Sequence, residues 1–151
     1  MAQTTILVVD DEPAITASLS YCLEQEGYEV ISAGDGKEAV QKVMDHIPDL
    51  IISDVMMPEV DGYELCRRIR QYYRTRHIPF LFLSAKSTSE SKLQGLELGC
   101  DDYITKPFDL TELITKVRRI IEQRAAAVES GLAGKVRRII EQNTAARDES
   151  G

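Results

Sequence analysis

Five short apolar segments recur along the first two thirds of the chain, with longer amphipathic segments between them. The apolar segments lie at residues 6–9, 28–32, 50–53, 80–83 and 103–105. Short apolar runs bounded by polar or turn residues predict β-strands, here strands buried on both faces. Because helical patterns separate the runs, we expect parallel strands joined by right-handed crossovers, and therefore an α/β fold.

The amphipathic segments predict five helices, at residues 13–27, 36–45, 62–74, 88–98 and 110–123. Pro13 favours the start of the first helix, and Gly27 favours its end. Asp109 and Glu112 resemble a capping box at the start of the fifth helix. The alternation of strands and helices follows from the pattern, whereas the order of the strands in the sheet does not.

Polar residues stand at the carboxyl ends of the predicted strands, namely Asp10, Asp11, Asp54, Ser84 and Lys106. Parallel strands bring these ends to one edge, where open α/β sheets bind ligands. Neighbouring carboxylates repel one another unless a cation lies between them. Mg²⁺ fits because it binds through one or two carboxylates and keeps its waters. We therefore expect a phosphoryl site with Asp54 as the nucleophile, Lys106 as a second positive charge and Ser84 as a hydroxyl donor.

A simpler interpretation is that these aspartates only cap the helices that follow them. Asp10 and Asp11 precede Glu12 and Pro13, a sequence that suits the start of a helix. This interpretation is the better one for a single aspartate. The whole set, placed at four strand ends, favours the phosphoryl site.

Four stretches of the chain form the pattern of a known family. They are residues 8–13, 54–58 followed by Asp61 and Gly62, 84–86, and 99–108. In this order, and with one strand–helix unit between each, they closely resemble the receiver domain of bacterial two-component response regulators over about residues 4–123. The resemblance implies a flavodoxin-like (βα)5 doubly wound sandwich with a five-stranded parallel sheet in the order 2-1-3-4-5.

The resemblance also implies roles for the acidic residues. Asp54 would be the phospho-acceptor. Asp11, Asp54 and the backbone carbonyl of Met56 would hold Mg²⁺, and Asp10 would help through a water molecule.

Further roles implied by the resemblance concern the later strands. Ser84 and Lys106 would each bond a phosphoryl oxygen. Tyr103 would be the aromatic switch residue that turns inward when Ser84 moves. The bond between Lys106 and Pro107 would be a cis peptide, a minority state for X–Pro bonds and thus a selected feature.

The function expected from these features is a signalling switch activated by phosphorylation. It would accept a phosphoryl group from a sensor histidine kinase or a phosphotransfer protein. It would then signal to a downstream protein partner through the surface of the fourth helix, fifth strand and fifth helix. A dimer formed through that surface or through the C-terminal tail is a further expectation.

Two other functions use related folds. A haloacid-dehalogenase-like, Mg²⁺-dependent phosphatase also has an aspartate nucleophile, but that class typically carries a second aspartate two residues later, where this chain has Met56. A flavodoxin-like electron carrier needs a phosphate-binding loop after the first strand. The acidic residues 11–12 would instead repel a flavin phosphate.

Composition narrows the choice of partner and compartment. The net charge of −7 argues against non-specific DNA binding, so we interpret the arginine-rich stretch 67–76 as a solvated helix face. Three cysteines without metal-ligand spacing indicate reduced thiols in a cytosolic protein. We find no signal peptide and no segment long enough to span a membrane, and therefore expect a cytoplasmic location.

The chain divides into an expected receiver domain, residues 1–123, and a tail, residues 124–151. The tail has 28 residues, which is too few for a DNA-binding output domain, so we expect none. Residues 135–142 repeat residues 116–123 without a change. This repeated segment is either a loosely docked helix or a helix that binds a partner, and the first interpretation is slightly favoured.

Overall fold

The computed structural model describes residues 3–85 and 101–126, and in these residues five strands form one parallel sheet. The strands are β1 (Thr5–Val9), β2 (Glu29–Ala33), β3 (Leu50–Asp54), β4 (Phe80–Ser84) and β5 (Asp102–Thr105). Their order in the sheet is β2-β1-β3-β4-β5, and every neighbouring pair is parallel. The flavodoxin-like strand order implied by the family resemblance is therefore confirmed.

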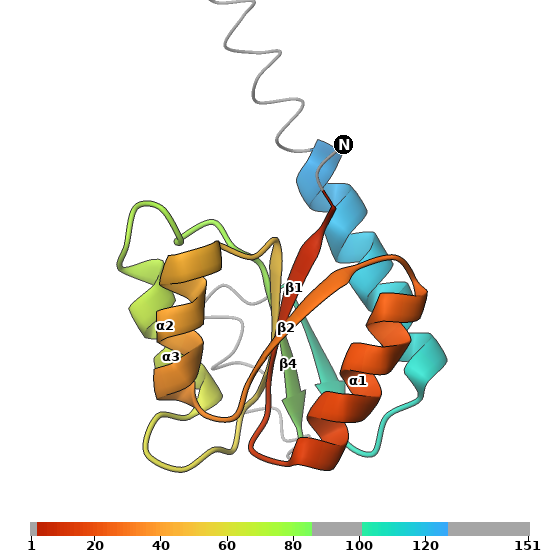
Figure 1. The fold of residues 1–151 in the computed structure, drawn as a ribbon, viewed down its shortest axis with the longest axis horizontal. Helices are drawn as coiled ribbons and strands as arrows, with labels where there is room; N and C mark the ends of the chain where they lie inside the picture. Colours follow the sequence, from red (N-terminus) through yellow and green to blue (C-terminus); the bar gives the residue numbers. More distant parts are fainter. Residues whose placement is uncertain (1–2, 86–100, 127–151) are drawn as a thin grey trace, which may run out of the picture.

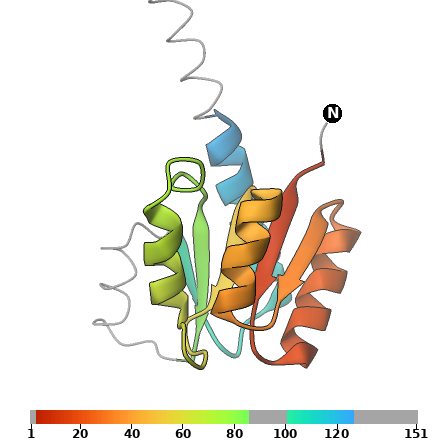
Figure 2. The same cartoon turned by 60° about the vertical axis from the view of Figure 1, so that its left-hand side comes forward.

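Helices cover both faces of the sheet, as a doubly wound fold requires. The helices with assigned bounds are α1 (Pro13–Gln25), α2 (Gly36–His46) and α3 (Gly62–Arg70), and a further helix runs over residues 110–126. Figure 1 shows α1 and the helix of residues 110–126 on one face, with α2 and α3 on the other. The turned view in Figure 2 shows the same three layers. The helix predicted at residues 88–98 lies outside the described residues.

Two clusters of buried side chains hold these layers together. Alternate residues of each strand point to opposite faces of the sheet, so Leu7 and Val9 pack toward α2 and α3, while Ile6 and Val8 belong to the other cluster. That second cluster includes Leu113 and other side chains from the helix of residues 110–126. All four residues of β1 named here are at most 1% exposed, and every residue of β3 and β4 is buried, which confirms burial on both faces for these three strands. The edge strands β2 and β5 are only partly buried, because each has a neighbouring strand on one side only.

Aspartate side chains start three of the helices. The Asp35 carboxylate accepts the N–H of Glu38 (2.7 Å), the Asp61 carboxylate accepts the N–H of Glu64 (2.8 Å), and the Asp109 carboxylate accepts the N–H of Thr111 (2.7 Å). Each bond satisfies a donor that the first helical turn leaves free. The expected capping box is found only in part, because the Glu112 carboxylate pairs with Lys116 at 3.5 Å.

The end of α3 differs from the prediction. The helix stops at Arg70, four residues before the expected end at residue 74. The Thr75 hydroxyl donates a hydrogen bond of 2.8 Å to the carbonyl of Ile69, and Arg70 donates to the carbonyls of Arg76 and Ile78. These bonds use carbonyl acceptors near the helix end and turn the chain toward β4.

The arginine-rich stretch and the cysteines take ordinary structural positions. Arg67 and Arg68 pair with Glu64 at exposed positions, as expected of a solvated helix face. Cys66 is buried and Cys22 is partly buried, both as free thiols, and the third cysteine lies outside the described residues. Over residues 3–85 and 101–126, no helix has both the length and the apolar character needed to cross a membrane.

Candidate functional site

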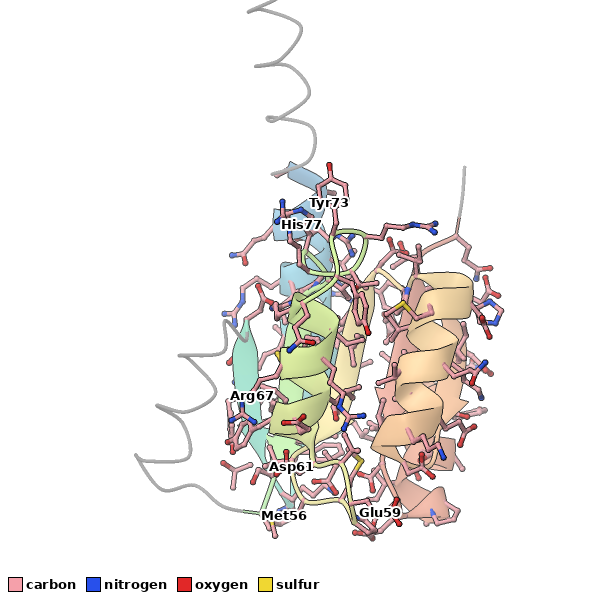
Figure 3. All side chains as sticks on the ribbon, turned by 90° about the vertical axis from the view of Figure 1, so that its left-hand side faces the viewer. Met56, Glu59, Asp61, Arg67, Tyr73 and His77 are labelled. Carbon is pink, nitrogen blue, oxygen red and sulfur yellow. The ribbon has the colours of Figure 1, made fainter. Side chains whose placement is uncertain are left out.

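The carboxyl ends of the parallel strands meet at one edge of the sheet, and the expected site residues gather there. β3 lies between β1 and β4, so the ends that carry Asp10, Asp54 and Ser84 are neighbours. Figure 3 shows Met56, which follows β3, at one end of the domain and Tyr73, from the turn after α3, at the other. The candidate site and the turn after α3 therefore lie at opposite ends of the domain.

Three carboxylates form the centre of the site. One ligand oxygen from each of Asp10, Asp11 and Asp54 lies within 4.8 Å of the other two. Asp10 and Asp54 are 1% and 5% exposed, whereas Asp11 is exposed. The structure thus brings together the three aspartates that the sequence pattern placed at one edge.

Lys106 supplies the positive charge that we expected beside them. Its ammonium lies 2.9 Å from Asp10 Oδ2 and 3.4 Å from Asp54 Oδ2. Burial lowers the pKa of Lys106, but the hydrogen bond to Asp10 and the charges of Asp10 and Asp54 outweigh it, so the pKa is raised. The Lys106–Pro107 peptide is cis, as the resemblance implied. Lys106 is therefore a fixed cation at neutral pH.

The Asp54 carboxylate occupies an electrostatically unfavourable position. Burial is the main cause of its raised pKa, the negative charge of Asp10 adds to the rise, and Lys106 opposes it. The backbone N–H of Met56 donates to Asp54 Oδ1 at 3.3 Å. Because one lysine offsets only part of the negative charge, the site favours the arrival of a further cation.

Asp10 precedes the N-cap residue of α1, Glu12, and no side-chain cap hydrogen bond is made there, so the structure does not show the capping role that the simpler interpretation assigned to Asp10. Its Oδ1 accepts the N–H of Glu12 at 2.9 Å, directly before α1. Its Oδ2 accepts a hydrogen bond of 2.9 Å from the Lys106 ammonium. Both oxygens of Asp10 are therefore engaged, while Asp11 presents its carboxylate to solvent. The capping interpretation of Asp10 is therefore not confirmed, and its role beside a metal ion stays a prediction.

The donor set fits Mg²⁺. Asp10, Asp11 and Asp54 offer only oxygen atoms, which are the ligands that hard divalent cations prefer. The exposed position of Asp11 leaves room for the waters that Mg²⁺ retains. Met56, whose carbonyl the family resemblance assigns to the metal, is 52% exposed.

Gly62 also lies at the site, and the sequence alone does not indicate why this position requires glycine. A Cβ at this position would lie 2.3 Å from the carbonyl oxygen of Asp54 and 3.0 Å from Cα of Val55. The Gly62 N–H also donates to the carbonyl of Val55 at 2.9 Å. The start of α3 is therefore packed directly against the strand end that carries Asp54, and only glycine permits this approach.

Ser84 and Tyr103 lie on the far side of Asp54, on β4 and β5. Ser84 is fully buried at the end of β4, and its carbonyl accepts the Lys106 N–H at 2.8 Å. The Tyr103 hydroxyl lies 3.0 Å from the hydroxyl of Tyr63 on α3. Sequence reasoning missed Tyr63, because nothing in the local pattern pairs two tyrosines 40 residues apart.

These observations define a doubly wound α/β protein with a cluster of three aspartates and one lysine at its carboxyl edge. Residues 6–118 match the family described as the response regulator receiver domain. This match covers most of the chain. The chain therefore belongs to the response regulator receiver domain family.

The sequence identity to two individual relatives supports the same family assignment. The alkaline phosphatase synthesis transcriptional regulatory protein PhoP of Bacillus subtilis is 47% identical over 125 residues, which are 83% of this chain and 51% of that protein. The DNA-binding dual master transcriptional regulator RpaA of Synechocystis is 43% identical over 118 residues, or 78% of this chain and 49% of RpaA. The chain thus spans about half the length of these two relatives.

A solved structure of similar size also matches. The crystal structure of a putative response regulator from Chloroflexus aurantiacus superposes with a TM-score of 0.76 and 40% sequence identity. The match covers 80% of this chain and 99% of that one. The family assignment leaves the phosphatase and electron-carrier alternatives without support.

Proposed function

We propose that this chain is a phosphorylation-activated switch in two-component signalling and that Asp54 is its phospho-acceptor. The observation that carries the proposal is the position of the buried Asp54 carboxylate. It lies within 4.8 Å of ligand oxygens of Asp10 and Asp11 and 3.4 Å from the Lys106 ammonium. In the reaction, a carboxylate oxygen of Asp54 attacks the phosphorus atom. The bond from phosphorus to the donor nitrogen breaks as the new bond to oxygen forms.

The residues around Asp54 position the phosphoryl group and balance its charge. Lys106 lies 3.4 Å from Asp54 Oδ2 and is placed to pair with a phosphoryl oxygen. Ser84, at the end of the neighbouring strand, would donate its hydroxyl to another oxygen. Asp11, Asp54 and the Met56 carbonyl would hold Mg²⁺, with Asp10 helping through water, and the ion would neutralise charge on the transferring group. Positioning and electrostatics supply most of the catalysis of such a transfer.

The natural donor would be a sensor histidine kinase or a phosphotransfer protein. The signal would pass to a downstream protein through the face formed by β5 and the helix of residues 110–126, together with the segment between β4 and β5. We also propose that residues 1–123 form the receiver unit. The relative RpaA is named as DNA-binding, so the expectation that this protein does not act on nucleic acid is not supported by the comparisons.

Incubation with acetyl phosphate and Mg²⁺, followed by intact mass measurement, tests the proposal. We expect one phosphoryl group on the wild-type chain and none on Asp54→Asn or in excess EDTA. Asp45→Asn is a matched control, because Asp45 is an exposed aspartate at the far end of α2 from the site-facing loops. Undiminished labelling of Asp54→Asn would move the acceptor to another residue.

A further inference from the structure

Two tyrosines from different elements meet behind the candidate site. Tyr63 is the second residue of α3, and Tyr103 is the second residue of β5. Their hydroxyls are 3.0 Å apart, a hydrogen bond in which either oxygen can be the donor. Tyr63 is 5% exposed and belongs to the core cluster under α2 and α3, whereas Tyr103 is half-buried at its margin.

The aromatic ring of Phe82 contacts the rings of both tyrosines. Tyr63 meets this ring edge-on, with the centroids 5.1 Å apart and the planes at 74°. The Tyr103 ring lies 6.3 Å from the same ring at 55°. Phe82 and Tyr103 are also register partners in the sheet. The packing therefore directs the Tyr103 side chain toward α3, which is an inward position.

The start of α3, which carries Tyr63, packs directly against the end of β3, which carries Asp54. The preceding residue, Gly62, donates its N–H to the carbonyl of Val55 at 2.9 Å and leaves no room for a Cβ against the carbonyl of Asp54. Tyr103 lies three residues before Lys106, which contacts Asp54 from the other side. The hydroxyl pair thus links two elements that both border Asp54.

We propose that Tyr63 is a positioning residue that stabilises the inward position of Tyr103 and so favours the phosphorylated form of the site. The inference rests on the proposed function and adds to it a residue outside the family motifs. The hydrogen bond between the two hydroxyls stabilises the position in which they meet, so outward rotation of Tyr103 is opposed by loss of the bond to Tyr63. If phosphorylation favours the inward position, linkage requires that a bond stabilising this position also favours the bound phosphoryl group.

The free energy of the hydrogen bond between Tyr63 and Tyr103 sets the expected size of the change in affinity. A net hydrogen bond between neutral groups changes an equilibrium by about twofold to tenfold. A purely space-filling role for Tyr63 predicts no such change, because phenylalanine fills the same volume against Phe82. The substitution Tyr63→Phe therefore separates the hydroxyl from the ring.

The experiment measures the affinity of the full chain for beryllofluoride, a phosphoryl mimic, in the presence of Mg²⁺ by isothermal calorimetry. It compares wild type with Tyr63→Phe, Tyr103→Phe and the double variant. We expect each single variant to bind about twofold to tenfold more weakly and the double variant to bind no more weakly than either single one, because both changes remove the same bond. Tyr21→Phe is the control, since Tyr21 is 64% exposed on α1, and it should bind as wild type does.

The outcomes distinguish the role of the Tyr63 hydroxyl from the proposed function of the chain. Equal affinity of wild type and Tyr63→Phe, or additive losses in the double variant, would refute the role of the hydroxyl pair and leave the proposed function standing. Failure of wild type to bind beryllofluoride would refute the proposed function, and the role of Tyr63 with it. A loss in unfolding free energy without a loss in affinity would show that the pair only stabilises the core, which also overturns the inference.

Discussion

The Lys106 ammonium lies closer to Asp10, at 2.9 Å, than to the proposed acceptor Asp54, at 3.4 Å. The Asp10 carboxylate is fully buried, so Lys106 is its main compensation for lost hydration. Lys106 thus pairs with both carboxylates at the strand ends, and in the proposed function it would also pair with a phosphoryl oxygen.

Removal of the lysine charge should destabilise the fold. We expect Lys106→Met to lower the free energy of unfolding by about 2–4 kcal/mol, because it leaves the buried Asp10 carboxylate unpaired. Urea denaturation measures the change. Arg118→Ala is the control, since Arg118 pairs with Glu26 at 2.9 Å on an exposed surface, and it should cost less than about 1 kcal/mol. Equal losses in the two variants would show that Asp10 does not depend on Lys106.

The two adjacent aspartates should differ in their effect on metal binding. Asp10 uses one oxygen for the Glu12 N–H and the other for Lys106, whereas Asp11 is exposed. We therefore expect Asp11→Asn to weaken Mg²⁺ binding by about tenfold or more and Asp10→Asn to weaken it less. Thermal unfolding midpoints at increasing Mg²⁺ measure both, because a ligand of the native state raises stability. A thermal unfolding midpoint of the wild type that does not change in millimolar Mg²⁺ would count against the proposed Mg²⁺ site.

A single methyl group should disturb the acceptor strand. In Gly62→Ala the new Cβ would lie 2.3 Å from the carbonyl oxygen of Asp54, so the backbone of α3 or β3 must move. We expect a loss of about 1–3 kcal/mol in unfolding free energy and slower phosphorylation by acetyl phosphate. Gly34→Ala is the matched control, because its Cβ would meet only the flexible end of Glu38 at 3.8 Å. Wild-type stability of Gly62→Ala would contradict the described contact.

The parallel strands and the aspartate cluster could be predicted because they depend on the local pattern of apolar and polar residues. The order of the strands came from the family resemblance. Apolar runs buried on both faces mark parallel strands, and parallel strands bring Asp10, Asp54 and Lys106 to one edge whatever the details of the helices. The end of α3 could not be predicted, because it depends on the Thr75 hydroxyl reaching the carbonyl of Ile69. The contact between Tyr63 and Tyr103 also depends on tertiary packing, and no spacing along the chain encodes it.

The reactivity of Cys66 should show its burial. Desolvation raises the pKa of this thiol to about 11, although Arg70 partly opposes the rise. Alkylation follows the thiolate, so labelling of Cys66 by iodoacetamide should be slow at pH 7 and should increase without a plateau up to pH 10. The folded state also holds this proton more tightly than the unfolded chain does, so the contribution of Cys66 to stability falls as pH rises past the ordinary thiol range.

Peptide mapping by mass spectrometry separates Cys66 from the other thiols. Cys22, which is only partly buried, is the internal reference and should be labelled faster. In urea the two thiols should react at similar rates. If Cys66 in the folded protein reacted at pH 7 as fast as it does in urea, the thiol would not be buried as described.

The boundary of the receiver unit can be tested by truncation. The helix of residues 110–126 buries Leu113, Val117 and Ile120, and Lys116 pairs with Asp102 at 3.2 Å. All of these contacts come from residues before 124, so a chain that ends at Gln123 should fold and accept phosphate at Asp54. One later contact, from Arg124 to the carbonyl of Asp49, would be lost.

A chain that ends at Ala126 keeps the Arg124 contact and is the matched control. We expect it to be more stable than the chain ending at Gln123 by up to about 1 kcal/mol, the usual net value of one hydrogen bond. Apart from this loss of stability in the chain ending at Gln123, both should differ from the full chain only in self-association, measured by sedimentation, because residues 135–142 repeat residues 116–123 and would compete for the same apolar contacts. An unfolded product, or a folded one that takes up no phosphate, would place the tail within the domain.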